Sequence, residues 1–248
     1  MGANLEITEK LQNYINDFGL KLNPIQQEII DYNNTLGDIK RMQIDPSQCY
    51  FLHLIVKISN IKNVLEIGSR DGYHADYLKK FFNIPGEKVF IVDAHPDCAN
   101  LIRREHPNYK VIEVAISDKP GILKFNAIQN SDLGSLGMSS LLPKTNGPVF
   151  GEKWVNVLAI TGEQLINLID EPEIDLLKLD VEGLTYEVLE SFSLNLRRIK
   201  FIHTEAEYTQ VWENQKLYSD VCDLLTKYGF KEAYKVDVLE GQCDTIWY

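Results

Sequence analysis

Short apolar runs and amphipathic stretches alternate from residue 61 to the end of the chain. Runs such as Val64-Leu65-Glu66-Ile67 are typical of buried strands, and the segments between them carry apolar residues at helical spacing. Because strands that alternate with helices form a parallel sheet covered on both faces, the pattern predicts an α/β domain over residues 61–248. The predicted strands are 63–67, 88–92, 110–115, 174–179 and 199–205, and the predicted helices are 73–82, 96–105, 161–169, 184–192 and 217–228.

The pattern changes at the C-terminal end, where two strands follow each other without a helix between them. These strands, 231–238 and 242–247, meet at a turn around Glu240-Gly241, and a turn that short forces an antiparallel hairpin. We therefore predict a central, mostly parallel seven-stranded sheet that ends in a C-terminal antiparallel hairpin and is flanked by helices.

Two segments do not follow this alternation. Residues 1–60 show helical periodicity only, over 5–18, 25–32 and 47–59, and predict an N-terminal helical extension. This extension is either a cap on the domain or a dimer surface or substrate lid. Residues 126–156 are rich in Gly, Ser and Asn, and a loop this long inside a compact domain is usually functional. We interpret it as a substrate loop rather than a passive insertion.

Composition narrows the classes of partner. Asp and Glu total 36 against 25 Lys and Arg, a formal charge of −11, which argues against nucleic acid and anionic membranes as partners. The N-terminus has no apolar signal core, and no apolar stretch is long enough to span a bilayer. The four cysteines, at 49, 98, 222 and 243, lack metal-ligand spacing. These observations favour a cytoplasmic protein.

A glycine-containing loop follows the first predicted strand. Gly68 lets the backbone turn sharply and approach a ligand, and the helix after Gly72 offers free N–H groups at its N-terminus. Asp93 follows the next strand, where an acid can accept hydrogen bonds from two ribose hydroxyls. Together these residues form the first βαβ unit of a nucleotide-binding sheet.

The position of Glu66 indicates which nucleotide binds. A dinucleotide fingerprint requires G-x-G-x-x-G, but here an acid precedes Gly68 on the strand. A carboxylate at that place repels a pyrophosphate and attracts an ammonium group. A ligand with an ammonium group, a ribose and no phosphate is S-adenosylmethionine. The alternatives are an NAD-dependent oxidoreductase and an α/β domain in which Glu66 is a solvated strand end.

A second group of polar residues follows the fourth and fifth predicted strands. Lys178, Asp180 and Glu182 lie two residues apart, and so do His203 and Glu205, so each set shares one face of its strand. If the two strands are adjacent, these side chains converge on one pocket at the ligand edge of the sheet. The simpler alternative is a structural ion pair between Lys178 and Glu205.

At this point the chain resembles the FkbM family of S-adenosylmethionine-dependent methyltransferases, over roughly residues 61–248. The resemblance rests on Leu65-Glu-Ile-Gly-Ser-Arg-Asp-Gly72, Asp93-Ala-His-Pro96, Ala115-Ile-Ser-Asp118 with Gly121, Ser139-Ser140-Leu141, Ile160-Thr161 and Ile174-Asp-Leu-Leu-Lys-Leu-Asp-Val-Glu-Gly183. Two departures stand out. The family usually has Glu at the position of Asp93, and Gly-Ala-Asn where this chain has Gly68-Ser69-Arg70.

The resemblance implies a Rossmann-like class I methyltransferase that O-methylates hydroxyls of sugars or polyketide-like metabolites. It implies that the cofactor is held by Glu66, Gly68, Ser69, Arg70, Gly72, Asp93, Ala94, His95, Ala115, Ile116 and Ser117. It places Asp180 at the methyl-transfer edge, with Lys178, Glu182, His203 and Glu205 completing the predicted catalytic group. The acceptor is expected to be a small molecule or a glycan, and the N-terminal helices could form a homodimer.

An alcohol is a poor nucleophile unless a base accepts its proton during attack. Asp180 and Glu205 rank first as bases here, since they end adjacent central strands, ahead of Glu182 and His203. The same carboxylates would also suit Mg²⁺, an alternative that stays open, although no metal site is predicted.

Tyr208 and Trp212, four residues apart, are either core residues or, if exposed, a flat platform for a sugar ring. A different class of function is a catalytically silent, cofactor-binding interaction module. The presence of Glu66, Asp93, Asp180 and Glu205 argues against that alternative, because a silent protein has no need of all four acids.

Overall fold

The computed structural model describes residues 31, 60–128, 137–147, 152–239 and 241–248, and Ile61–Tyr248 is one of the two compact units into which the chain divides. Apart from residue 31, the predicted helices 5–18, 25–32 and 47–59 lie outside the described residues. The helical extension, the lid and the dimer surface therefore stay predictions. None of the helices in the described part is long and apolar enough to cross a membrane.

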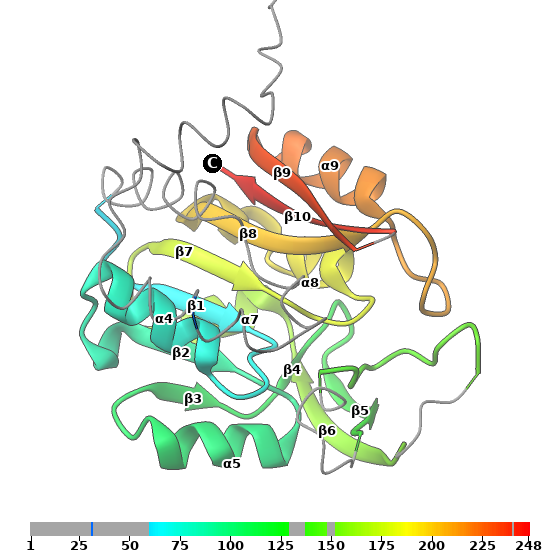
Figure 1. The fold of residues 1–248 in the computed structure, drawn as a ribbon, viewed down its shortest axis with the longest axis horizontal. Helices are drawn as coiled ribbons and strands as arrows, with labels where there is room; N and C mark the ends of the chain where they lie inside the picture. Colours follow the sequence, from blue (N-terminus) through cyan, green and yellow to red (C-terminus); the bar gives the residue numbers. More distant parts are fainter. Residues whose placement is uncertain (1–30, 32–59, 129–136, 148–151, 240) are drawn as a thin grey trace, which may run out of the picture. The chain divides into compact units, whose positions relative to one another are not determined.

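A seven-stranded sheet forms the centre of the 61–248 unit (Figure 1). Its strand order is β3-β2-β1-β7-β8-β10-β9; the first five strands are parallel, and β10 pairs antiparallel with both β8 and β9. This confirms the predicted sheet and its C-terminal hairpin. The strands are β1 (Val64–Ile67), β2 (Val89–Val92), β3 (Lys110–Ile112), β7 (Ile174–Leu179), β8 (Ile199–Glu207), β9 (Glu232–Leu239) and β10 (Gln242–Trp247).

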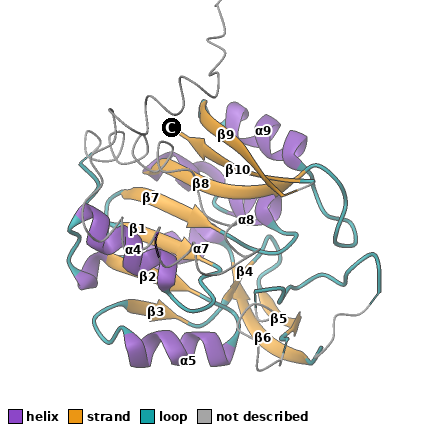
Figure 2. Ribbon diagram, in the orientation of Figure 1, coloured by secondary structure: helices purple, strands orange, loops and turns teal. Residues whose placement is uncertain are grey.

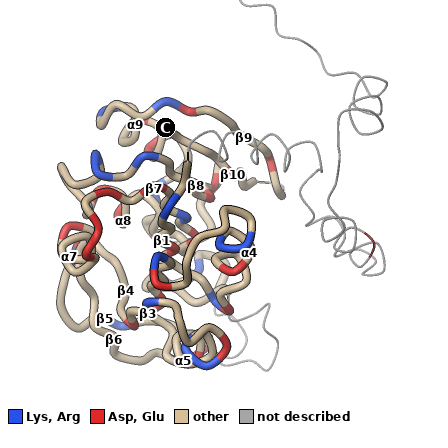
Figure 3. Tube along the Cα trace, turned by 90° about the vertical axis from the view of Figure 1, so that its left-hand side faces the viewer, with Lys and Arg blue, Asp and Glu red and all other residues tan. Residues whose placement is uncertain are grey.

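Helices cover both faces of this sheet. Figure 2 shows α4 in front of β1 and β2, and the side view in Figure 3 places α4 on one side of the sheet and α7 and α8 on the other. The α-helices are α4 (Tyr73–Phe82), α5 (Pro96–Glu105), α7 (Gly162–Leu168), α8 (Thr185–Ser191) and α9 (Tyr218–Lys227), and the short 3₁₀ helices are Gly86–Lys88 and Ser193–Arg198. All five predicted helices are present: α4 and α5 have the predicted ends, and α7, α8 and α9 are each shorter by one residue at both ends.

The two faces of the sheet differ in character because side chains alternate along each strand. On one face Leu65, Leu177 and Ile202 join the main hydrophobic core, which includes residues of α7, α8 and α9. On the other face Glu66, Lys178 and His203 are register partners across β1, β7 and β8. The predicted site residues Glu66, Lys178 and His203 therefore lie on the face of the sheet opposite the main core.

A second, three-stranded sheet was not predicted. It consists of β4 (Ala115–Ile116), β6 (Trp154–Ile160) and β5 (Gly121–Asn126), in that order. The predicted continuous strand 110–115 is wrong, because the main-sheet strand ends at Ile112 and residues 115–116 pair with β6 instead. The predicted loop 126–156 is too long at both ends. Val157 and Ala159 are buried and Asn156 and Leu158 are exposed along β6, but the exposed Leu158 is apolar, so the sequence does not show the alternation of apolar and polar residues that would predict this strand.

The segment 137–147 connects the second sheet to the region after β8. Ser140 forms a β-bridge with Asn126, and Lys144 forms one with Trp212. The backbone N–H of Thr145 donates to the carbonyl of Val211 at 3.0 Å. This part of the predicted substrate loop therefore lies against the residues that follow the fifth parallel strand.

Candidate active site

The glycine loop after β1 is packed against the end of β7. Gly68 has φ +79°, and a Cβ at this position would lie 1.9 Å from the carbonyl oxygen of Asp180. The amide of Gly68 donates to the carbonyl of Val92, and the amide of Asp180 donates to the carbonyl of Ile67. Only glycine fits this contact, so the residue joins the cofactor loop directly to the strand that carries the catalytic candidates.

Glu66 lies fully buried at the end of β1 and spans the loop. Its Oε2 accepts hydrogen bonds from the Ser69 hydroxyl at 2.8 Å and from the Ala75 amide in α4 at 3.1 Å. Its Oε1 has no hydrogen-bond partner among the described residues, and the nearest cationic candidate is Nδ1 of His74 at 3.9 Å. Burial raises the pKa of Glu66 to about 8. One carboxyl oxygen is therefore left for a ligand.

Asp93 follows β2 and fixes the same loop from the other side. Its Oδ2 accepts the backbone N–H groups of Ser69 and Arg70 at 3.1 and 2.9 Å, and its Oδ1 accepts that of His95 at 2.8 Å. Arg70 adopts φ +57° and its guanidinium pairs with Asp71. The first function of Asp93 is thus to hold the loop, and the ribose contact predicted for it stays a prediction.

Five more of the residues predicted to hold the cofactor lie at or near the edge where β2 and β4 end: Ala94, His95, Ala115, Ile116 and Ser117. Both ring nitrogens of the buried His95 are engaged: Nδ1 accepts the amide of Asp97 and caps α5, and Nε2 lies 3.2 Å from the carbonyl of Ile128. The tautomer consistent with both contacts carries the proton on Nε2. The remaining members are the half-buried Ala94 and the buried Ala115, Ile116 and Ser117.

Lys178 is buried between acids on the polar face of the sheet. Its Nζ lies 3.1 Å from Oδ2 of Asp180, so the alternative pairing with Glu205 is not the one formed. Burial opposes both charges, but the pKa of Lys178 is raised on balance by Asp180 and other acids, and the Lys178 ammonium lowers the pKa of Asp180. The pair is therefore ionised at neutral pH. Figure 3 shows acidic and basic positions together around β7 and β8.

The pKa values of two further acids at this edge, Glu182 and Glu205, are raised, whereas that of Asp180 is lowered. Burial, with Asp180 next in importance, raises the pKa of Glu182 to about 7. Burial also raises the pKa of Glu205, and Asp180 and Glu182 raise it further. Asp180 and Glu182 therefore lie close enough to Glu205 to affect its pKa, in keeping with the predicted convergence of these acids at one edge. Neighbouring carboxyls whose pKa values are pushed apart can divide acid and base roles between them.

The backbone and side chain of Glu182 are both anchored. The Ser140 hydroxyl donates to the Glu182 carbonyl at 2.7 Å, and Nε1 of Trp212 donates to its Oε2 at 3.2 Å. Gly183 has φ +78°, and a Cβ there would lie 2.6 Å from the Trp212 ring. Both Glu182 and Gly183 are therefore in contact with Trp212, which lies thirty residues after Glu182 in the sequence.

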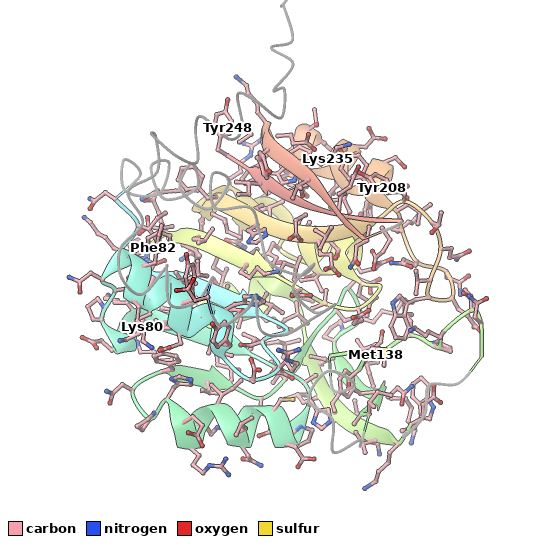
Figure 4. All side chains as sticks on the ribbon, viewed as in Figure 1. Lys80, Phe82, Met138, Tyr208, Lys235 and Tyr248 are labelled. Carbon is pink, nitrogen blue, oxygen red and sulfur yellow. The ribbon has the colours of Figure 1, made fainter. Side chains whose placement is uncertain are left out.

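Of the two alternatives given for Tyr208 and Trp212, the core position is confirmed for Trp212, and the exposed platform is wrong. Trp212 is 0% exposed, and the segment that follows β8 is not a helix, so the two residues do not share a face. Tyr208 instead donates to Asp237 at 2.6 Å and lies near Lys235, whose Nζ is 5.5 Å from the ring centroid (Figure 4).

Two residues near the site were not predicted. Asp244 on β10 lies 3.8 Å from Nε2 of His203, and burial is outweighed by His203 and Lys178, which lower the pKa of Asp244. His74 lies beside Glu66 at the start of α4. For Asp244 a signal existed, because the hairpin and the period of two place it on one face with Gln242 and Ile246; for His74 there was none.

In the part of the chain that the structure describes, no group of three or more His, Cys, Asp or Glu is arranged to hold a metal ion, and the magnesium alternative stays a prediction.

The fold is that of a class I methyltransferase. Its defining features are the strand order, the antiparallel C-terminal hairpin of β9 and β10, the glycine loop after β1 and the acid after β2. Residues 66–232 match the model of the methyltransferase FkbM domain. The chain therefore belongs to the FkbM family of S-adenosylmethionine-dependent methyltransferases. The oxidoreductase alternative is set aside.

A curated relative is the 2-O-methyltransferase NoeI of Sinorhizobium fredii (strain NBRC 101917 / NGR234), which is 25% identical over 191 residues, 71% of this chain and 77% of NoeI. Among solved structures, an O-methyltransferase from Bacillus cereus in complex with SAH is 16% identical, covers 96% of each chain and has a TM-score of 0.46. The SAH-bound methyltransferase PaMTH1 of Podospora anserina is 12% identical, covers both chains in full and has a TM-score of 0.46.

Proposed function

We propose that the protein transfers a methyl group to a hydroxyl oxygen of a sugar, glycan or polyketide-like small molecule. Three observations support this function. The chain belongs to a methyltransferase family, a relative named as a 2-O-methyltransferase is 25% identical to it, and several acids with divided protonation states lie where the catalytic strands end. A hydroxyl acceptor loses its proton during attack, and a carboxylate at this edge can accept that proton.

The residues around the glycine loop fit S-adenosylmethionine. The unpartnered Oε1 of Glu66 suits an ammonium group, and the lone pairs that remain on Asp93 suit ribose hydroxyls. The absence of a side chain at Gly68 allows the ligand to approach the backbone closely. When bound, the cofactor supplies an already activated methyl group, so the protein has to provide alignment and a place for the acceptor's proton.

We assign the role of general base to Glu182, ahead of Asp180 and Glu205. A base works best when its pKa lies near the working pH, and the pKa of Glu182 is about 7. Trp212 fixes one carboxyl oxygen and leaves the other for the acceptor. During methyl transfer this carboxylate would accept the proton of the acceptor hydroxyl.

The neighbouring groups have supporting functions in this assignment. Asp180, held ionised by Lys178, keeps negative charge beside Glu182 and so raises the affinity of Glu182 for the proton. Glu205 is neutral at pH 7 and can donate a hydrogen bond to an acceptor oxygen. The observation that carries the assignment is the anchored Glu182 carboxyl next to an acid that stays charged.

The test compares wild type with Glu182→Gln, which retains an oxygen that can accept from Trp212. S-adenosylhomocysteine binding is measured by calorimetry, and methyl transfer is measured with radiolabelled donor and a panel of methyl pyranosides and phenols. We expect unchanged binding and a loss of transfer of about 10²- to 10⁴-fold. The exposed Glu213→Gln is the matched control. Full activity in Glu182→Gln with loss in Asp180→Asn would move the base to Asp180, and binding without transfer to any acceptor would favour the silent module.

A further inference from the structure

Asn126 at the end of β5 is a buried amide without partners. It is 0% exposed, and neither Oδ1 nor Nδ2 has a hydrogen-bond partner among the described residues. A buried polar group in that state costs stability, and proteins rarely keep one without a use. Its backbone is fully engaged, because its N–H donates to the Ser140 carbonyl at 2.8 Å and its carbonyl accepts from Ser140 at 3.3 Å.

The pairing with Ser140 fixes the direction in which the amide points. Residues directly opposite in an antiparallel pair project to the same face. The Ser140 hydroxyl on that face donates to the carbonyl of Glu182. The Asn126 side chain therefore lies on the face that Ser140 turns toward the methyl-transfer edge. Figure 4 shows Met138, two residues before Ser140, beside the second sheet.

Trp154 continues this row on the other side of β5. It is the register partner of Asn126 in β6, so it shares the same face, and it is 42% exposed. Neighbouring strands lie about 4.8 Å apart, so the row from Ser140 through Asn126 to Trp154 extends about 10 Å. That length matches one or two sugar rings. A flat aromatic face beside an amide with free donor and acceptor atoms suits a ring with hydroxyl groups at its edge.

We propose that Asn126 and Trp154 form the acceptor subsite, in which the Trp154 indole packs against a pyranose ring and the buried Asn126 amide becomes accessible on binding and pairs with two of its hydroxyls. This inference rests on the proposed function and narrows the acceptor to a pyranoside. Trp154 takes the platform role that the sequence suggested for Trp212. The subsite begins at Ser140, whose hydroxyl contacts the residue assigned as the base.

The experiment uses the full chain with Asn126→Leu and Trp154→Ala, and Leu158→Ala as control, since Leu158 is exposed on the same sheet but outside the row. Methyl β-D-glucopyranoside, methyl β-D-galactopyranoside and methyl α-D-mannopyranoside are the probes, with S-adenosylhomocysteine affinity and melting temperature measured for each variant. We expect both subsite variants to raise KM for the accepted pyranoside by tenfold or more while cofactor affinity changes by less than about threefold. The melting temperature of Asn126→Leu should rise by about 2–4 °C, because an unpartnered amide is removed.

Each other result has a defined meaning. Unchanged KM in both variants, or a lower melting temperature for Asn126→Leu, overturns the subsite and leaves the proposed function standing. A wild-type enzyme that methylates phenols but no pyranoside overturns the acceptor class. Absence of S-adenosylhomocysteine binding in wild type overturns the proposed function, and this inference with it.

Discussion

Replacement of Glu66 by Gln tests the electrostatics of the cofactor loop. The side chain is fully buried, and its Oε2 holds both Ser69 and Ala75. Gln retains an oxygen for these two hydrogen bonds and removes only the ionisable group. The variant therefore separates the effect of the charge from the effect of the loop geometry.

The raised pKa of Glu66 determines how the stability difference between wild type and Glu66→Gln changes with pH. Burial moves the pKa of Glu66 from 4.5 to about 8 in the folded chain, so the folded state keeps a proton that the unfolded state has lost. The wild type is therefore destabilised as pH rises through this window, and Gln is not. At roughly 1.4 kcal/mol per pKa unit, the stability of Glu66→Gln relative to wild type should rise by about 3–4 kcal/mol between pH 5 and pH 8.

Urea unfolding of both proteins at pH 5, 6, 7 and 8 measures this difference directly. The exposed Glu163→Gln in the first turn of α7 is the control and should give a flat difference. A flat difference for Glu66→Gln as well would refute the argument, because it would mean that the carboxyl is ionised in the folded protein throughout. At pH 7 the variant should also bind S-adenosylhomocysteine at least tenfold more weakly, since the ligand's ammonium group lowers the pKa of Glu66 and pairs with the resulting carboxylate, which Gln cannot form.

Three further substitutions test other contacts of the site. Gly183→Ala should lower the free energy of unfolding by about 2–4 kcal/mol, because the new Cβ meets the Trp212 ring in a backbone region with φ +78°; thermal melting measures this. Asp93→Ala should weaken S-adenosylhomocysteine binding tenfold or more in calorimetry, since three backbone N–H groups lose their acceptor. Lys178→Met should cost about 3 kcal/mol at pH 8 and less at pH 5, because Asp180 can accept a proton at low pH; equal losses at both pH values in urea unfolding would contradict this.

The main sheet could be predicted because its signals are local. Each buried strand is a short apolar run, each helix has its own period, and the hairpin follows from a two-residue turn. The convergence of Asp180, Glu182 and Glu205 also followed, since adjacent parallel strands end at one edge. Their charge states did not follow, because these depend on burial and on Lys178 reaching Asp180 rather than Glu205. For that reason we propose Glu182 as the base, ahead of Asp180 and Glu205, which the sequence favoured.

The parts that were missed depend on contacts between distant segments. Trp212 is buried because Gly183 makes room for it and Glu182 accepts its N–H, and neither contact can be read from the spacing of Tyr208 and Trp212. The second sheet joins residues 115–126 to residues 154–160, across a segment whose composition resembles a loop. The partnerless amide of Asn126 is visible only once its neighbours are placed.

The unequal burial of the three tryptophans provides an optical reporter. Trp212 and Trp247 are buried at 0% and 3%, whereas Trp154 is 42% exposed. A soluble quencher such as iodide should therefore reach Trp154 far more readily than the other two indoles. Protection of its fluorescence by a compound added to the unlabelled protein would report occupancy beside the second sheet, so acceptor collections could be screened without a turnover assay.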